Sequence, residues 1–394
     1  MTPMNAIAAA THADPYPYYA ALVAGPALRY DAQLDLWLAA GVGAVEAVLA
    51  DPHCAVRPAS QPVPPAIDGS AAGAVFGQLL RMNDGARHAR PKLALRAALA
   101  GVDLAALRPA ARGIAAALAA ARELRHGDAL SAWLFEVPLY TVAGLLGFAP
   151  AQWPALGARM ADFVACLSPL SAAPQLARAS VAAPSLLEGV RALLRGAPAR
   201  QGSLLRDVLG EAAAAGWDDG EAILANLLGL LSQTYEATAG LIGNCITELS
   251  VRPALAAALA GAPERIALLV AEVSRFNAPV QNTRRYAART TRVCGVEIAA
   301  GQGILLLLGA AGRDPAGNAD PQRFLLERPA RRVFGFGHGA HACPGHALAC
   351  AIAAAAIEAL LARPDWPPAA PLAWRYRPSA NARIPVFHRA GEMA

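Results

Sequence analysis

Lysine is nearly absent from this sequence. Lys92 is the only lysine in 394 residues, so almost all of the 34 basic side chains are arginines, and the net charge is only +5. The chain contains no lysine- and arginine-rich block of the kind that binds nucleic acids. We therefore expect no nucleic-acid partner.

Paired cysteines, targeting signals and long apolar runs are also missing. The six cysteines show no paired spacing, which favours free thiols in a reducing compartment. The N-terminal segment has no charged stretch followed by an apolar one, as a signal peptide would have. No uninterrupted apolar run of about 18 residues occurs. These absences predict a cytoplasmic protein without a membrane anchor.

Hydrophobic residues, in contrast, make up 56% of the chain and charged residues only 16%, which allows a large buried core. The pattern from 102 to 217 is helical, with breaks at prolines. The last thirty residues suit a pair of strands. We predict a mainly α protein with a smaller β-rich part, organised as one domain over residues 1–394.

The first part of the chain predicts short elements. Residues 16–23 and 42–50 are expected to form helices on either side of a hairpin over 27–39. Residues 56–74 are rich in Pro, Ala, Gly and Ser and therefore predict a loop. Further along, the Pro- and Ala-rich segment 165–200 is expected to form a mobile lid.

The glycine-rich stretch from Phe334 to Gly345 carries the clearest chemical signal. Cys343 lies in it, and an Ala-rich run that predicts a helix follows at once. Glycines let backbone amides approach a sulfur atom closely, and both amides and a helix N-terminus stabilise negative charge there. We therefore interpret Cys343 as an anionic sulfur ligand.

Two other interpretations of this stretch are open. Its histidines and cysteine could form a zinc site, because imidazole and thiolate both bind zinc. The residues concerned are His338, His341, Cys343 and His346. Gly335, Gly337 and Ala340 could form a degenerate dinucleotide fingerprint, which would need a preceding strand and a following acidic residue.

Residues 219–250 predict one helix of about 30 residues, roughly 45 Å long at a rise of about 1.5 Å per residue. A polar stripe with spacings of three, four and seven interrupts its apolar surface. The stripe consists of Gly229, Gln233, Glu236, Ala237, Gly240 and Asn244. Polar side chains on a buried helix need partners or a purpose, so we expect this stripe to face a site.

Two charged pairs lie on predicted helices. His88 and Lys92 are four residues apart and share a face, and Glu272 and Arg275 are three apart. Either pair alone would suit an ordinary helix surface. Arg328 follows in a proline-rich segment just upstream of the cysteine stretch.

Together these motifs resemble those of the cytochrome P450 family, in the family's order and over essentially the whole chain. The cysteine stretch fits the family signature F-G-x-G-x-H-x-C-x-G at every fixed position. These positions are Phe336, Gly337, Gly339, His341, Cys343 and Gly345. Glu272 and Arg275 match the family's E-x-x-R motif, and Arg328 matches its meander arginine. The resemblance implies that these three residues brace the cysteine loop.

Four positions depart from the family pattern. Lys92 stands where the H-x-x-x-R motif has arginine, which keeps a cation but loses the bidentate fork. In the oxygen-activation helix, usually A-G-x-[D/E]-T-T, Gln233 and Thr234 replace the Ala-Gly pair and Glu236 keeps the acid. Ala237 takes the place of the residue that usually carries a hydroxyl group, and Thr238 comes one place later. A helix turns about 100° per residue, so Thr238 cannot simply replace that hydroxyl.

The resemblance implies the cytochrome P450 fold and a bound haem b. Cys343 would be the axial iron ligand, with Phe336 and Gly337 beside the haem. Four basic residues would hold the haem propionates, namely His88, Lys92, Arg285 and His341. The distal catalytic residues would be Gln233, Glu236, Ala237 and Thr238.

The implied reaction is monooxygenation of a small, mostly apolar organic molecule, in secondary metabolism. Electrons would come from a ferredoxin and its NAD(P)H-dependent reductase. The missing alcohol at Ala237 also fits a peroxygenase, a dehydratase or a rearrangement enzyme on the same scaffold. A non-catalytic haem sensor is less favoured, because Glu236 would then have no role on the stripe.

Overall fold

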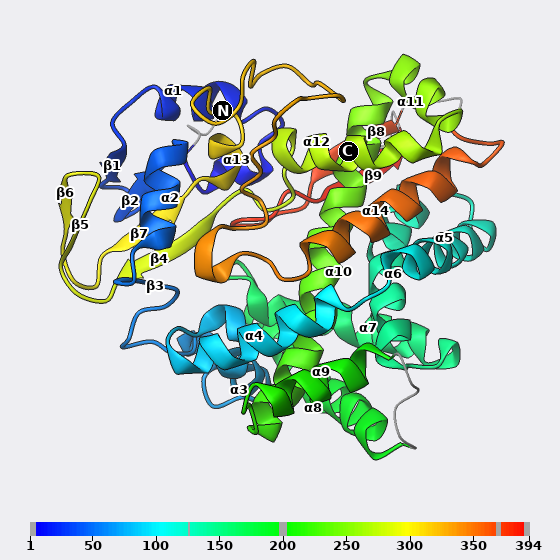
Figure 1. Ribbon diagram of the computed structural model, residues 1–394, viewed down its shortest axis with the longest axis horizontal. Coiled ribbons are helices and arrows are strands. Elements are labelled where there is room, and N and C mark those ends of the chain that lie inside the picture. The colour runs from blue at the N-terminus through cyan, green and yellow to red at the C-terminus, as the bar shows by residue number, and fades with distance from the viewer. Residues whose placement is uncertain (1–4, 125–126, 197–202, 368–371, 390–394) are drawn as a thin grey trace.

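The computed structural model describes residues 5–124, 127–196, 203–367 and 372–389, and helices dominate it (Figure 1). The helices are α1 (Tyr16–Val23), α2 (Val42–Ala50), α3 (Ala71–Gln78), α4 (Ala86–Ala100), α5 (Leu104–Ala120), α6 (Gly127–Leu146), α7 (Trp153–Phe163), α8 (Ala173–Arg195), α9 (Leu204–Ala214), α10 (Gly220–Ser250), α11 (Pro253–Ala260), α12 (Ile266–Phe276), α13 (Leu308–Ala311) and α14 (His346–Leu361). The strands are β1 (Leu28–Asp31), β2 (Leu36–Ala39), β3 (Cys54–Ala55), β4 (Thr283–Ala287), β5 (Thr291–Val293), β6 (Val296–Ile298), β7 (Gly303–Leu306), β8 (Leu372–Tyr376) and β9 (Pro385–Arg389). The prediction of a mainly α protein with a smaller β-rich part is confirmed.

Helix α10 passes through the middle of the helical part, and the other helices pack around it (Figure 1). Asp219 begins the helix as its N-cap, because its carboxylate accepts a hydrogen bond from the amide of Ala222 at 3.0 Å. The 31 residues of α10 cover nearly all of the helix predicted over 219–250. Its buried flanks pack against α6, α12 and α14.

The main sheet lies beside the helical part (Figure 1) and has the strand order β1-β2-β7-β4-β3. β2 and β7 run parallel, and the other neighbouring strands are antiparallel. The predicted hairpin over 27–39 corresponds to β1 and β2. β4 carries Arg285, whose side chain is buried.

A second hairpin, β8–β9, brings the C-terminal part of the chain against α10. The two approach so closely that a Cβ atom on Gly243 would lie 2.5 Å from Cγ of Pro385. At the next residue, the side-chain amide of Asn244 donates hydrogen bonds to the backbone carbonyls of Asn277 at 2.8 Å and Arg383 at 3.1 Å. The end of the predicted stripe at 240–244 is therefore closed by protein.

One helix, α6, has the length and hydropathy of a membrane span within the described part of the chain, and the bent pair Pro253–Ala260 and Pro263–Phe276 would also pass if joined. Most of α6 is buried, and it packs against α5 and α10. Core helices of ordinary globular proteins pass the same test, so the finding is weak evidence for a membrane span.

Two predicted loops contain more helix than the sequence suggested. The segment 56–74 was expected to be a loop, but α3 begins at Ala71, where the Ser70 side chain accepts a hydrogen bond from the amide of Gly73 at 3.0 Å. Within 165–200, α8 continues through Pro184. The described part of this segment is therefore largely helical, and its role as a mobile lid stays a prediction.

The close approach at Gly243 allows a test of the fold. Gly243→Ala should lower the free energy of unfolding by about 1–3 kcal/mol, because the new methyl group would overlap the ring of Pro385. Gly113→Ala on α5 is the matched control, since a Cβ there meets no other group within 4 Å. That variant should gain about 0.5–1 kcal/mol from helix propensity. Chemical denaturation would measure both, and equal stabilisation of both variants would contradict the packing described.

Candidate functional site

The loop before α14 holds Cys343 in a fixed turn. The amide of Cys343 donates to the carbonyl of Phe336 at 2.7 Å, and the amide of Gly337 donates to the carbonyl of Phe334 at 2.8 Å. Gly337 has φ +72°, a conformation that side-chain-bearing residues rarely adopt, so glycine is required there. Cys343 itself is accessible rather than packed into the core.

The pKa of the Cys343 thiol reflects opposing influences. Although the residue is accessible, the protein atoms around its sulfur displace water and raise the pKa of the thiol, and the backbone amide of Gly345 and the charge of Lys92 offset this only partly. A coordinated metal ion deprotonates a thiol outright, so a metal ion bound at Cys343 would hold its sulfur as a thiolate.

One face in the middle of α10 is partly accessible, and we call it the open face. Leu230, Gln233, Thr234 and Ala237 are partly accessible, although the residues around them on the same helix are buried. Their spacing of three, four and seven places them on one face. The side-chain amide of Gln233 donates to the carbonyl of Gly229 at 2.9 Å. Thr238 is only 2% exposed and lies off this face.

Glu236 lies beside the open face and is ion-paired. Its carboxylate is 3.2 Å from the guanidinium of Arg377, which follows β8. Burial raises the pKa of Glu236 above its ordinary value, although the charges of Arg377 and Arg81 pull it down. A carboxyl group with a raised pKa can exchange protons closer to neutral pH than an exposed one.

Basic side chains gather beside the cysteine loop. The rings of His88 and His341 lie 4.0 Å apart, and the Lys92 ammonium donates to the carbonyl of Ala342. Nε2 of His341 lies 3.0 Å from Oδ1 of Asp84. Burial, together with the neighbouring charges of His341 and Lys92, lowers the pKa of His88 to about 4.

Arg285 completes this group, which we call the basic cluster (His88, Lys92, Arg285 and His341). Arg285 is 6% exposed and its charge acts on both Asp84 and His88. Nε2 of His88 is buried and has no hydrogen-bond partner. Buried polar atoms are nearly always hydrogen-bonded, and one carboxylate does not balance these cations. The cluster therefore fits a bound group with more than one anionic oxygen, such as the two propionates of a haem.

The zinc interpretation of the cysteine stretch is not supported. In the described residues, no three or more His, Cys, Asp or Glu side chains come together so as to hold a metal ion. His341 faces His88 and Asp84, and the ring of His346 stacks on Phe336 with centroids 3.8 Å apart. The histidines of the stretch therefore point to different partners.

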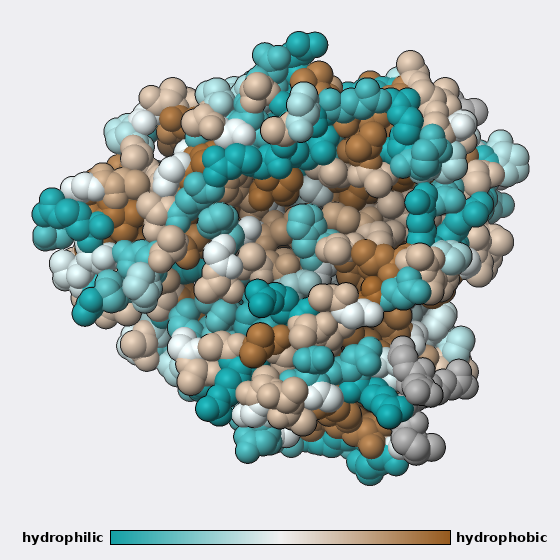
Figure 2. Space-filling view, viewed as in Figure 1, coloured by the Kyte–Doolittle hydropathy of each residue, from teal (hydrophilic) through white to brown (hydrophobic). Residues whose placement is uncertain are grey.

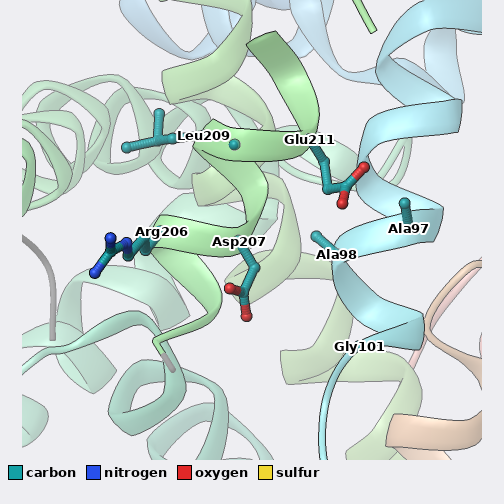
Figure 3. A pocket seen from close by; sticks show the side chains of 8 residues that line it. Ala97, Ala98, Gly101, Arg206, Asp207, Leu209 and Glu211 are labelled. Atoms are coloured by element: carbon teal, nitrogen blue, oxygen red, sulfur yellow. The ribbon is translucent and has the colours of Figure 1, made fainter. Parts of the chain in front are cut away.

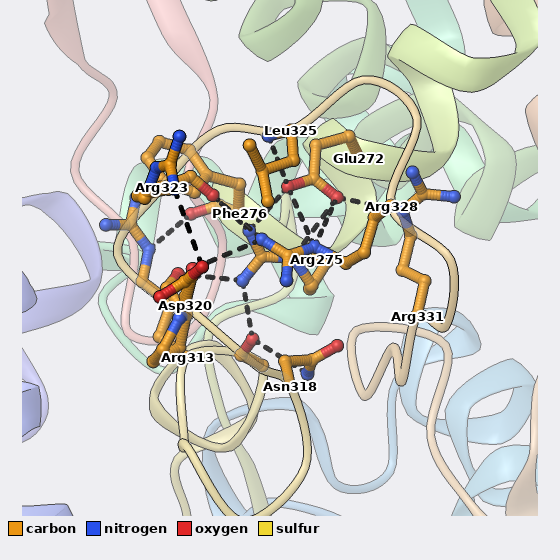
Figure 4. A network of polar contacts seen from close by, with 12 residues as sticks. Glu272, Arg275, Phe276, Arg313, Asn318, Asp320, Arg323, Leu325, Arg328 and Arg331 are labelled. Carbon is orange, nitrogen blue, oxygen red and sulfur yellow. Dashed lines mark hydrogen bonds and ion pairs between the residues drawn. The ribbon is translucent and has the colours of Figure 1, made fainter.

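Glu272 anchors the segment that leads to the cysteine loop (Figure 4). Its buried carboxylate is 2.5 Å from Nη2 of Arg275, 3.3 Å from Nε of Arg328 and 2.8 Å from Nε of Arg331. It also accepts the amide of Leu325 at 3.1 Å. Burial alone would raise the pKa of Glu272, but the hydrogen bonds from Arg275 and Arg331 hold it below its ordinary value.

Several residues of the site escaped the sequence analysis. Arg331 is a third arginine that pairs with Glu272. Its position three residues after Arg328 is the sequence feature from which this pairing could have been predicted. Arg377 pairs with Glu236 across a long sequence separation, and Arg81 lies near the same carboxylate. No local pattern marks the last two, because their roles arise from the tertiary fold.

The outer surface offers a different kind of hollow. Figure 3 shows one between α4 and α9, lined by Ala97, Ala98, Gly101, Arg206, Asp207, Leu209, Gly210 and Glu211. It is open to solvent, and none of the predicted site residues lines it. On the face shown in Figure 2, hydrophilic side chains interrupt the apolar ones. The region around Cys343, where His88, Lys92 and His341 gather, is therefore the better candidate site.

An accessible cysteine just before one helix, a basic cluster beside it and an open face on a second helix that packs against the first are typical of a haem-thiolate class of site. Residues 267–369 match the family described as Cytochrome P450. The cytochrome P450 monooxygenase PikC of Streptomyces venezuelae is 30% identical over 371 residues, which cover 90% of this chain and 85% of PikC. The chain therefore belongs to the cytochrome P450 family.

Other relatives match over shorter stretches. The biotin biosynthesis cytochrome P450 of Bacillus subtilis is 39% identical over 144 residues, 36% of each chain. Cytochrome P450 107B1 of Saccharopolyspora erythraea is 32% identical over 256 residues, so these two alignments span 36% and 61% of the relatives' own lengths.

Solved structures show the same fold over nearly the whole chain. CalO2 superposes with a TM-score of 0.82 and 24% identity, covering 99% of both chains. P450BioI, in complex with an acyl carrier protein ligated to hexadec-9Z-enoic acid, superposes with a TM-score of 0.81 and 24% identity, covering 95% of this chain and 97% of P450BioI. The expected cytochrome P450 fold is confirmed.

The buried histidine of the basic cluster predicts a pH dependence of the haem-free protein. His88 binds a proton near pH 6.5 when unfolded and near 4 when folded, so the unfolded state holds more protons between these values. The free energy of unfolding should therefore fall by roughly 2 kcal/mol between pH 7 and pH 5. Denaturation of the native protein and of His88→Gln would measure it, because the variant lacks this contribution.

His12→Gln is the control, since His12 is exposed near the N-terminus. It should keep the pH dependence of the native protein. Haem should weaken the effect, because propionates near His88 would favour its protonated form. An identical pH profile in native protein and His88→Gln would contradict the placement of His88.

Proposed function

We propose that this chain is a haem-thiolate monooxygenase that inserts one oxygen atom from O2 into a small, mostly apolar organic molecule. The observation that carries the proposal is the placement of the basic cluster beside the accessible Cys343, just before α14, which packs against α10. The residues of α10 around its open face are mostly apolar, which suits an apolar substrate.

The cofactor proposed is haem b, held in one domain that comprises the whole chain. Cys343 would bind its iron, and the basic cluster would bind its propionates. Phe336 and Gly337 shape the loop next to the sulfur atom. When bound, the haem supplies the oxidising chemistry, because a thiolate ligand donates electron density that favours cleavage of the O–O bond of dioxygen.

Electrons would come from a ferredoxin and its NAD(P)H-dependent reductase, as in many bacterial members of the family. We place the protein in the cytoplasm and in secondary metabolism. PikC and the other relatives named above support a bacterial cytochrome P450 in general. The particular partner and pathway belong to the proposal.

Proton delivery is the step for which this chain departs from the family pattern. Ala237 has no hydroxyl, and Thr238 is buried off the open face. Gln233 and Glu236 lie on or beside the open face, and the Glu236 carboxyl has a raised pKa. A relay from Glu236 therefore needs a bridging group. We propose that a polar group of the substrate, or a water molecule that it orders, supplies the bridge.

The same departure favours a second candidate function. An enzyme that takes its oxygen from peroxide, or that catalyses a dehydration or rearrangement, has less need for a hydroxyl at Ala237. A non-catalytic haem sensor is less favoured, because Glu236 is kept half-buried beside the open face at a cost in desolvation.

Iron ligation can be tested with two cysteines. Cys343→Ala should lose the red-shifted Soret band that the reduced carbon-monoxide complex of a thiolate-ligated haem shows. Cys350→Ala is the matched control, because Cys350 lies on α14 within the packed interior and should leave the band unchanged. Loss of the band in the Cys350 variant alone would refute the assignment of Cys343.

Proton delivery can be tested at position 237. With a substrate that lacks a polar group near its oxidised carbon, the native enzyme should consume NAD(P)H and release peroxide with little product. Ala237→Thr should raise the product formed per NAD(P)H roughly tenfold, since it restores a hydroxyl for the relay. Ala237→Val has the same shape without the hydroxyl and should give no such gain.

Equal coupling in the valine and threonine variants would contradict the relay argument. Efficient turnover with added peroxide, together with none from NAD(P)H and redox partners, would instead establish the peroxygenase alternative.

A further inference from the structure

Arg81 carries a guanidinium group without a protein partner. It lies in the short turn Leu80–Met82 between α3 and α4. Its Nε is buried and unpaired, and the side chain makes no hydrogen bond or ion pair with any residue of the described ranges. Buried arginines are normally paired, because an isolated buried charge is costly. The described part of the chain therefore provides no bonded counter-ion for Arg81.

The backbone around Arg81 is held rigidly against α10. Asn226 on α10 accepts the amide of Leu80 at 2.8 Å, and its side-chain amide donates to the carbonyl of Gln78 at 2.9 Å. Asn83 closes the turn from the other side by donating to the carbonyl of Leu79 at 2.8 Å. The guanidinium is thus presented from a fixed backbone, which reduces the entropy lost when a ligand binds.

Arg81 lies on the side of Glu236 rather than beside the basic cluster. Burial lowers the pKa of Arg81, and the groups whose attraction opposes this are Glu236 and then Cys166. The members of the basic cluster act instead on one another and on Asp84. Arg81 therefore does not belong with the residues that fit the propionates.

The charges around Glu236 do not balance. Its carboxylate is already paired with Arg377 at 3.2 Å. Arg81 is a second cation close enough to lower the pKa of the same carboxyl group. The Arg377 side chain is 40% exposed, so water screens much of its charge, whereas Nε of Arg81 is buried and has no bonded partner in the described part of the chain. One further anionic group would balance the charge of Arg81.

We propose that Arg81 binds a carboxylate of the substrate, so that the substrate is an organic acid whose apolar body lies along the open face of α10. The inference rests on the proposed monooxygenase function and specifies its substrate class. A guanidinium group offers two parallel N–H donors that match the two oxygens of a carboxylate. An alcohol, ester or amide of the same shape could not replace that charged pair.

The test uses probes that report binding through the haem spectrum and need no turnover. These are ω-(imidazol-1-yl)alkanoic acids, from hexanoic to dodecanoic, and the corresponding ω-(imidazol-1-yl)alkanols, titrated at neutral pH. At the best chain length the acid should bind the native protein about 10- to 100-fold more tightly than the alcohol, as expected for a charge-assisted hydrogen-bonded pair. Arg81→Gln should abolish this preference, and Arg81→Lys should keep part of it.

Arg29→Gln is the matched control, because Arg29 is an exposed arginine on β1, and it should keep the full preference. The melting temperature of Arg81→Gln without ligand should equal or exceed that of the native protein, because the change removes an unpaired buried charge.

Three results would overturn the inference. Equal binding of acids and alcohols by the native protein at every chain length would show that no anion is recognised. Loss of haem from Arg81→Gln would place Arg81 with the propionates, and a strongly lowered melting temperature would give it a structural role. In each case a normal thiolate spectrum of the native protein would leave the proposed function standing, whereas its absence would remove that function as well.

Discussion

The buried carboxylate of Glu272 is the interaction on which the cysteine loop depends. A single carboxylate among three arginines stabilises the fold little by itself, because removing charges from water is costly. The main effect of this carboxylate is to fix the positions of the arginines around it. Arg275 and Arg328 use their remaining N–H groups to bind backbone carbonyls of an irregular segment, including those of Gly312, Pro321 and Arg323. Carbonyls without a strand or helix partner are thereby satisfied, and the path to Cys343 is fixed.

Helix α10 plays two parts along its length. Toward its C-terminal end it is packed tightly, since Gly243 and Asn244 contact the C-terminal hairpin and the segment after α12. In its middle it carries the open face, where Gln233 and Ala237 are partly accessible. The packed half is what holds the open half in place, because a helix anchored at one end cannot shift easily to fill a space beside its middle.

The sequence was most informative where the chemistry demands particular residue types at fixed spacing. The cysteine loop needs Gly337 at positive φ, and the brace needs a carboxylate and an arginine one turn apart, so both could be recognised without a structure. Helix boundaries such as those of α10 followed from periodicity and from the Asp219 cap. The partners of Glu236 could not be predicted. Arg377 comes from a distant part of the sequence, and no residue spacing in the sequence indicates its contact with Glu236.

Basic side chains with a buried nitrogen that has no partner within the chain are candidates for ligand binding, whereas basic side chains with such partners support the fold. Around Glu272 every guanidinium group is bonded to a carboxylate or a carbonyl, so the surplus of arginines there is satisfied within the chain. Near the cysteine loop His88 keeps a buried nitrogen without a partner, and beside Glu236 so does Arg81. Different neighbouring charges act on these two side chains: those of His341 and Lys92 on His88, and those of Glu236 and Cys166 on Arg81. If the propionates of haem complete the first, a separate anion would complete the second, and the substrate is the molecule that enters that part of the pocket.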